Sequence, residues 1–419
     1  MRAGGGVLFG VPRAAAIPSG LVGRRRPSRC YSVSSSSDHS SFIKDVAATP
    51  PPAHLNHLLR ILQLRAGEEL ISPGAKKGLI PLVVPLSKTS TGSITALLRW
   101  PTAPAGMEMP VVEVRKYGVW LLAKNVEQFI NRILVEEDVK GFEERYDELF
   151  DTSAVARNKF YKKGDFAASH ISSFEAYVLK KIGLFPDILE RKVKQHFDKG
   201  DHVSALVTGE FYTKKEHFPG FGRPFVFNAE ILLKVGRILE AKDAARGALK
   251  SPWWTLGCEY QEVAKIAQWE DEQIEYIKEK VTDEGKQQDL KKGKDPAQVA
   301  LDEAAFLLDL ASIDGTWDEH IHRIAECYRE AGLHDIAAFI LYSPRGYGDM
   351  LLHILVRRML GLGGLLCSAS RVSSVSPRLP FVVVMLRTFC LHIICLSAAT
   401  GCRRDRRISS CLFFRYVPS

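Results

Sequence analysis

The sequence predicts a mainly α fold, in which a small α+β unit precedes an array of helical hairpins and both ends of the chain are disordered. Strand-like alternation and a hairpin pattern occur within residues 54–140. From residue 153 to residue 342, every strong hydrophobic pattern has the period of a helix. The two ends, residues 1–43 and 343–419, have compositions unlike that of the middle. We therefore expect two folded regions between two atypical ends.

Net charge separates the ends of the 419-residue chain from its middle. The whole chain carries a formal charge of +9, but residues 1–43 contribute +5 and residues 351–419 contribute +9. Residues 44–350 therefore carry −5. A mildly acidic folded region disfavours a protein that binds nucleic acid through a basic surface.

The first 43 residues have the composition of an organelle transit peptide. They are rich in Arg and Ser and contain one acidic residue, Asp38. No apolar run of adequate length follows the first basic residue, which excludes a secretory signal. A leader that is disordered but not removed is the alternative. This composition alone does not separate a plastid from a mitochondrial destination.

The composition changes abruptly after Tyr342. Lys and Glu disappear, and five of the eight Cys occur there. The run 379–400 is apolar, but Arg387 near its middle would cost about 2.5–3.5 kcal/mol on insertion, so we expect no stable membrane insertion. Three interpretations are open: a tail anchor, a disordered extension, or translated sequence foreign to the fold, such as a retained intron. The loss of Lys and Glu favours the third.

The α+β unit is predicted from short, well-separated patterns. Residues 54–64 place Leu at helical spacing, which predicts a short helix. Residues 93–100 alternate apolar and polar side chains, as a strand with one buried face would. The pattern of residues 111–114 and 119–123 predicts two strands of a hairpin with Gly118 at the turn.

The helix after this hairpin has the clearest pattern in the chain. Asn125 is a suitable N-cap, with Gln128 three residues later. The apolar residues that follow have the spacing of one helix face: Val126, Phe129, Ile130, Ile133 and Leu134.

The helical region contains three segments in which Ala follows Gly by five residues: Gly200 with Ala205, Gly236 with Ala241, and Gly332 with Ala337. Gly permits a tight turn between two helices, and small Ala side chains let the helices pack closely. The middle segment, residues 233–249, resembles the second half of a tetratricopeptide repeat. Because the intervals between the three glycines are unequal, we expect a degenerate array rather than a regular solenoid.

A polar stretch divides the helical region. Residues 283–296 are rich in Lys, Asp, Gly and Gln, which predicts an exposed loop or hinge. Beyond it, a deeply buried helix is predicted from five residues at helical spacing: Leu301, Ala304, Ala305, Leu308 and Ala311.

No catalytic, cofactor-binding or metal-binding residue is predicted, and no cofactor is expected. Lys76 and Lys77 lack the flanking Gly and Ser or Thr of a phosphate-binding loop, so residues 73–78 read as a turn with exposed lysines. Cys258 and Cys327 read as isolated buried thiols.

The remaining candidates for chemistry also have structural interpretations. His320 and His322 point to different sides of a helix, and two ligands do not make a metal site even with Cys327 nearby. His54 and His57 share a helix face but lack a third partner. Three acidic residues are interpreted as cap and surface charges: Asp302, Glu303 and Asp309.

Two aromatic segments have both a structural and a functional interpretation. Residues 218–225 contain two Gly, two Pro and three Phe, with Pro224 at the first position of the next helix. These residues and Arg223 either fix the start of that helix or grip a partner. Trp253 and Trp254 pose the same choice, and one of the two is expected to be exposed. Helices predicted at 224–239 and 240–251 would bring both segments close together.

Several long stretches of the sequence are distinctive and are not shared with generic helical repeats: 71–110, 196–207, 209–215, 218–225, 248–257, 266–285 and 297–317. They resemble a plant family called protein in chloroplast ATPase biogenesis. The resemblance runs from about residue 54 to residue 342 and ends where the composition changes.

The resemblance implies a stromal, non-enzymatic factor that helps to assemble the catalytic core of the chloroplast ATP synthase, CF1. It implies action on the γ subunit after chaperonin-assisted folding, with the chaperonin as a second candidate partner. The family supplies no catalytic or ligand residues. A concave surface of helical hairpins could hold a long helix. The alternatives are an organellar helical-repeat protein that binds RNA, which the acidic middle disfavours, and an enzyme. A mitochondrial location is the alternative destination.

Overall fold

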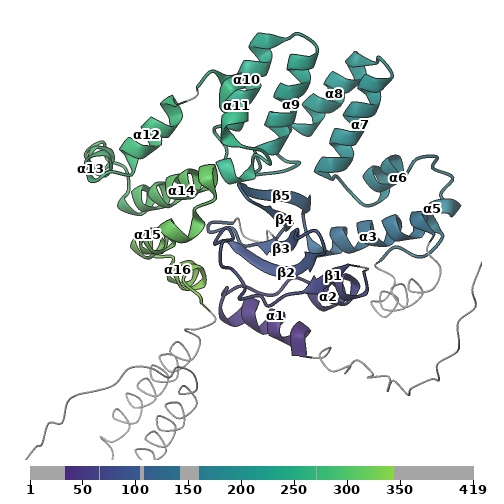
Figure 1. The fold of residues 1–419 in the computed structure, drawn as a ribbon, viewed down its shortest axis with the longest axis horizontal. Helices are drawn as coiled ribbons and strands as arrows, with labels where there is room; N and C mark the ends of the chain where they lie inside the picture. Colours follow the sequence, from purple (N-terminus) through teal and green to yellow (C-terminus); the bar gives the residue numbers. More distant parts are fainter. Residues whose placement is uncertain (1–33, 66, 104–107, 142–159, 270, 344–419) are drawn as a thin grey trace, which may run out of the picture. The chain divides into compact units, whose positions relative to one another are not determined.

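The computed structural model describes residues 34–65, 67–103, 108–141, 160–269 and 271–343, all within one compact unit (Figure 1). The first 33 residues of the predicted leader lie outside the described residues. So do the apolar run 379–400 and the five cysteines of the tail. The predicted fold class is confirmed: the described chain is mainly helical, with one small antiparallel sheet near its N-terminus.

The sheet is an antiparallel meander of five strands in the order of the chain. Its strands are β1 (Glu68–Leu70), β2 (Val83–Thr89), β3 (Ile94–Leu98), β4 (Val111–Arg115) and β5 (Gly118–Ala123). The predicted strand and hairpin correspond to β3 and to β4 with β5, whereas β1 and β2 were not predicted. In β3, Ala96, Leu97 and Leu98 are all buried, so the sheet is covered on both faces there and the expected single buried face is wrong.

Three helices lie beside the sheet: α1 (Ser34–Asp45), α2 (Leu55–Leu64) and α3 (Val126–Lys140). The cap of α3 is confirmed, because Asn125 accepts a hydrogen bond from the Gln128 backbone N–H at 2.8 Å. Helix α1 contains residues that the sequence placed in the leader. Its Phe42 and Ile43 are buried, and the ring of His39 lies 3.2 Å from the carbonyl oxygen of Pro85 in β2.

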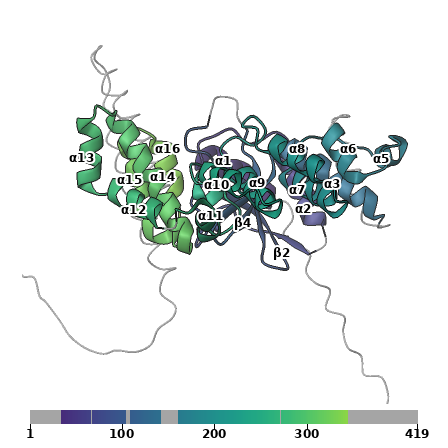
Figure 2. The ribbon, with the colours of Figure 1, turned by 90° about the horizontal axis from the view of Figure 1, so that it is seen from above.

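The remaining helices follow in chain order. The first group is α5 (Asp165–Ala168), α6 (Phe174–Lys181), α7 (Pro186–Asp198), α8 (His202–Tyr212), α9 (Arg223–Lys234), α10 (Ile238–Ala248) and α11 (Tyr260–Ala267). The second group is α12 (Glu272–Lys280), α13 (Asp283–Lys291), α14 (Pro296–Asp314), α15 (Trp317–Glu330) and α16 (His334–Ile340). A 3-10 turn at Trp253–Thr255 separates α10 from α11. Seen from above, α14, α15 and α16 lie side by side (Figure 2).

The three predicted Gly–Ala segments each form a tight helical hairpin. Gly200, Gly236 and Gly332 have positive φ angles of 73°, 78° and 80°, which favour Gly. The Ala that follows each glycine is fully buried, as the close packing of paired helices requires. The middle hairpin turns at Gly236, between α9 and α10, so the helix boundary expected near residue 240 lies too late in the chain.

Two predictions for the polar stretch and its neighbour are wrong in part. Residues 283–291 form helix α13 rather than a loop, because Thr282 caps the helix and Lys280 pairs with Asp289 at 2.6 Å. The low apolar content correctly indicated exposure but not the absence of a helix. In α14, Ala305 is exposed although it was expected in the core.

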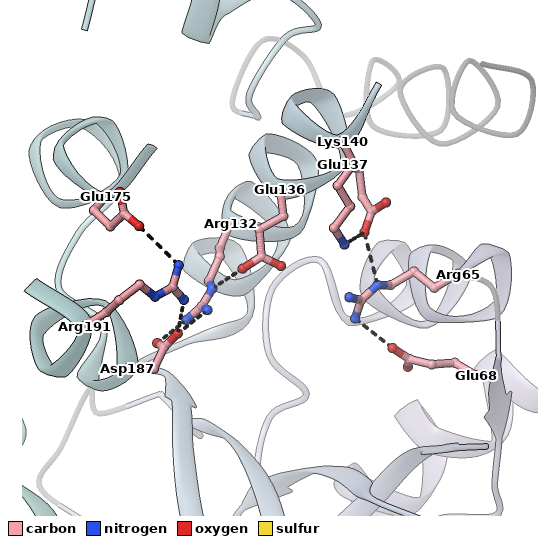
Figure 3. Close-up of polar contacts among 9 residues, drawn as sticks. All are labelled: Arg65, Glu68, Arg132, Glu136, Glu137, Lys140, Glu175, Asp187 and Arg191. Atoms are coloured by element: carbon pink, nitrogen blue, oxygen red, sulfur yellow. Dashed lines mark hydrogen bonds and ion pairs between the residues drawn. The ribbon is translucent and has the colours of Figure 1, made fainter. Parts of the chain in front are cut away.

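Ion pairs fix the helical array to the helix that follows the sheet (Figure 3). Arg132 of α3 donates two hydrogen bonds of 2.6 Å to Asp187 at the start of α7, and a third to Glu136. Burial alone would lower the pKa of Arg132, but these carboxylates outweigh it and raise the pKa. Arg191 joins Asp187 to Glu175 of α6. Each of these charged side chains has a partner of opposite charge, so the ion pairs hold α3, α6 and α7 together.

Candidate binding cleft

The turn that carries Trp253 and Trp254 joins the sheet to the helical array. Trp253 packs on Tyr260 with ring centres 4.2 Å apart, and its indole N–H donates to the carbonyl oxygen of Leu249. Trp254 packs on Trp100, just after β3, with ring centres 5.0 Å apart. Both tryptophans are 3% exposed, so the expectation that one would be exposed is wrong. Adjacent aromatic side chains can both be buried here because the turn lies between two packed regions.

The tip of the β4–β5 hairpin fits closely against this turn. Gly118 has a φ of 148°, and a Cβ atom there would lie 2.0 Å from the backbone oxygen of Trp254. A side chain at this position would therefore displace the turn. Gly118 is needed both for its backbone conformation and for this approach.

The two aromatic segments lie close together, as predicted. The Gly222 backbone N–H donates to the Thr255 hydroxyl at 2.9 Å, and Phe221 packs on Trp100. Phe218 and Phe221 are buried, so these rings are part of the core and do not form an exposed surface for a partner.

Arg223 is also occupied within the fold. It donates to Glu190 of α7 at 2.8 and 3.0 Å and to Glu230 at 2.8 Å. Burial alone would lower the pKa of Arg223, but Glu190 outweighs it and raises the pKa. Arg223 therefore does not offer a free charge to a partner, and the interpretation of Arg223 as a partner-binding residue is wrong.

A cleft of about 610 Å³ opens beside the tryptophan turn. The segment after β3, the residues after α10, and helices α12 and α14 line it. Its lining includes Trp100, Trp254, Tyr276, Leu301 and Phe306. The Tyr276 side chain is 49% exposed at the rim, and Ala305 is exposed beside it. The lining of the cleft is mainly apolar, although Lys250, Gln273 and Gln298 also contribute, and the cleft is open to solvent and of a size typical for ligand sites.

One carboxyl group lies in this cleft. Asp309 of α14 is 9% exposed, and its Oδ1 accepts a hydrogen bond from the Trp253 backbone N–H at 2.7 Å. Burial raises the pKa of Asp309 to about 8, an effect that this single hydrogen bond only partly offsets. The interpretation of Asp302, Glu303 and Asp309 as surface charges is wrong for the last two. Glu303 is also buried, and Arg323 binds both of its oxygens at 2.8 Å.

Two other cavities are lined by different elements. One of about 530 Å³ includes Lys76, which is buried, donates to the Phe339 carbonyl oxygen at 3.0 Å and lies over the Phe339 ring. Burial lowers the pKa of Lys76 well below its ordinary value, so the prediction of an exposed lysine holds for Lys77 alone. The other, of about 380 Å³, lies beside Lys124 and Phe218.

Helix α8 presents an exposed apolar stripe. Val203, Val207 and Phe211 lie at successive four-residue intervals and are 74%, 61% and 36% exposed. Leu239, at the start of α10, is 79% exposed. This stripe was not predicted from the sequence, although the spacing of its residues on one helix face could have revealed it.

The other candidates for chemistry are dispersed. Among the described residues, no three His, Cys, Asp or Glu side chains are grouped to hold a metal ion. His322 is exposed, whereas Cys327 on the same helix is buried, and burial raises the pKa of its thiol to about 12. His54 and His57 pack their rings on each other and on Phe160. No helix in the described part of the chain is long and apolar enough to cross a membrane.

These features define a class of protein: a mainly helical fold around a small meander sheet, with an apolar cleft where the two meet. The amino-acid sequence matches three domains of one protein family. The PAB N-terminal, PAB middle and PAB C-terminal domains match residues 37–181, 186–270 and 274–342. An Arabidopsis thaliana protein named IN CHLOROPLAST ATPASE BIOGENESIS, chloroplastic, is 68% identical over 308 residues, which are 74% of this chain and 92% of that protein.

The chain therefore belongs to the IN CHLOROPLAST ATPASE BIOGENESIS family, as the resemblance in its sequence indicated. The three matched segments all contribute to the cleft. Trp100 comes from the N-terminal segment, Trp253 from the middle segment and Asp309 from the C-terminal segment.

Proposed function

We propose that this protein is a chloroplast factor for the biogenesis of the ATP synthase. The observation that carries the proposal is its 68% identity to the Arabidopsis protein over 92% of that protein's length. At this identity the fold and the cleft walls are expected to be shared. Its role is to bind an assembly partner and release it unchanged, so that the protein acts by binding rather than by catalysis.

We propose that the protein binds the γ subunit of CF1 in the stroma, after chaperonin-assisted folding of that subunit. The family resemblance implies this partner. The structure offers a compatible surface, because an open apolar cleft lies beside paired helices and a long helical subunit needs such a groove.

We also infer that the two ends of the chain, before Ser34 and beyond residue 343, do not contribute to the folded region. A transit leader would end before Ser34, because α1 packs Phe42 and Ile43 into the core. Import into isolated chloroplasts would then leave a mature chain that keeps α1 and loses Arg24–Arg26. The tail beyond residue 343 is proposed to add nothing to partner binding.

The test is capture of partners by the full-length chain. The tagged protein is incubated with chloroplast stromal extract, and the bound proteins are quantified against an untagged control. We expect the γ subunit among the most enriched proteins, with capture unchanged by ribonuclease. Salt-sensitive capture of RNA without any ATP synthase subunit would contradict the proposal and favour the RNA-binding alternative.

A further inference from the structure

The carboxyl group of Asp309 differs from every other buried carboxyl group among the described residues. Four acidic side chains are buried there: Glu137, Glu190, Glu303 and Asp309. Glu137 lies 3.1 Å from Lys140, and Glu190 and Glu303 are each held by two nitrogens of an arginine. Asp309 has no cation within ion-pair distance in the described part of the chain. A buried carboxyl group without a cation costs stability and marks a candidate functional site.

The unpaired carboxyl group is accessible from the cleft. Oδ1 of Asp309 binds the Trp253 backbone N–H, whereas Oδ2 makes no hydrogen bond to a described residue and is not sealed from solvent. Asp302, on the same face of α14 and two turns earlier, also lines the cleft but is neutralised by Lys294. The cleft therefore offers one acid without an ion-pair partner, among lining residues that are mainly apolar.

The walls of the cleft restrict what could supply the missing cation. One carboxylate does not hold a metal ion, which needs several oxygen ligands. A Lys or Arg side chain suits both features, because its stem packs on apolar surface while its charged end reaches an acid. Leu301 and Phe306 line the cleft and would contact such a stem, and the exposed ring of Tyr276 would attract its cation.

We propose that the cleft binds an apolar segment of the protein's assembly partner, with a Lys or Arg of that segment paired to Asp309. This inference rests on the proposed function for the identity of the partner. The recognition itself is set by the chemistry of the cleft: apolar walls for the segment and one free acid for its cation. An aliphatic segment without a basic residue would leave Asp309 buried and unpaired.

The experiment compares matched variants of the full chain. Asp309→Asn keeps an oxygen that can accept from Trp253 but cannot ionise, and Asp314→Asn is the control, because Asp314 is exposed at the end of the same helix and does not line the cleft. Affinity for the recombinant γ subunit is measured by calorimetry. Asp309→Asn should weaken binding at least about tenfold, and Asp314→Asn should change it by no more than about twofold. Unchanged affinity of Asp309→Asn for a subunit that the wild type binds would overturn the inference and leave the proposed function standing.

A second set of probes needs no change in the protein. Overlapping peptides covering the γ subunit are prepared in two forms, one natural and one with every Lys and Arg replaced by Gln. The wild type should bind a natural peptide that combines apolar and basic residues, and should lose it in the Gln form. The losses from the Gln peptide and from Asp309→Asn should not add, because both remove the same pair.

The peptide results separate the two proposals. Binding of basic peptides that depends on Asp309, without binding of the intact γ subunit, would support the cleft's chemistry and contradict the proposed partner. Equal binding of natural and Gln peptides, or no binding of either form, would overturn the inference.

Discussion

The α3–α7 junction and the cleft bury ionisable groups in opposite ways. At the junction, Arg132 holds Asp187 through two hydrogen bonds of 2.6 Å, and each charge has a partner (Figure 3). In the cleft, Asp309 is buried with one backbone hydrogen bond and no cation among the described residues. Paired charges hold two elements in register, whereas an unpaired acid costs stability. The difference teaches that a buried ionisable group is structural where its partner lies within the protein, and available for binding where it has no such partner.

The aromatic side chains packed on Trp100 beside the cleft are structural, like the ion pairs of the junction. Changing Phe221→Ala together with Trp254→Ala should unfold the protein or cost about 3–5 kcal/mol for each ring, because both rings are buried against Trp100. Denaturant unfolding followed by circular dichroism measures this loss. A folded double variant of ordinary stability would show that these rings are not part of the core.

The Arg223–Glu190 pair tests the claim that internal pairs are structural. Arg223→Ala would leave Glu190 buried without its cation and should lower the free energy of unfolding by about 3–5 kcal/mol. Arg237→Ala is the matched control, because its pair with Glu240 is exposed and should be worth no more than about 1 kcal/mol. Equal effects of the two changes in urea unfolding would contradict the distinction.

Asp309→Asn should stabilise the protein, increasingly so as the pH rises. The folded protein keeps the Asp309 proton up to a pKa of about 8, whereas the unfolded chain releases it near the ordinary pKa of about 4. Stability contributed by this group is therefore lost as the pH rises between these two values, by up to about 1.4 kcal/mol per unit. Thermal unfolding at several pH values should show that the Tm of the variant rises relative to that of the wild type between pH 5 and pH 8. A difference in Tm between the two proteins that does not change with pH would contradict the assignment of Asp309 as a buried, unpaired acid.

The exposed stripe on α8 provides the smallest expected effect. Replacing Val203 and Val207 by Ser should change the free energy of unfolding by no more than about 0.5 kcal/mol for each residue, because both side chains are largely exposed. Binding of the γ subunit should also persist if the cleft is the binding surface. Loss of binding in this variant, with Asp309→Asn unaffected, would move the partner surface from the cleft to α8.

The parts of the fold that local patterns determine could be predicted from the sequence. The cap at Asn125, the β4–β5 hairpin and the three glycine turns each depend on residues close in the chain. Strand β2 escaped prediction because it is buried on both faces and contains Pro85 at a register shift, so it has no alternation. Helix α13 escaped because its ion pairs, rather than apolar residues, support it.

The candidate site could be predicted only in part. The proximity of residues 218–225 to the tryptophan turn followed from a helical hairpin between them. The burial of both tryptophans did not, because it depends on Trp100 and Gly118, which arrive from the sheet. Nothing local distinguishes Asp309 from its neighbours in α14. Its lack of a cation emerges only when every element around the cleft is in place.

The most direct test is hydrogen exchange of the full chain with and without the recombinant γ subunit. If the cleft binds the partner, exchange should slow in α12 and in the first turns of α14, which form its exposed rim around Tyr276 and Ala305. Asp309→Asn should reduce that protection at the same concentration of subunit. Protection confined to α8, or slowed exchange that leaves α12 and α14 unchanged, would contradict the assignment of the cleft as the binding site.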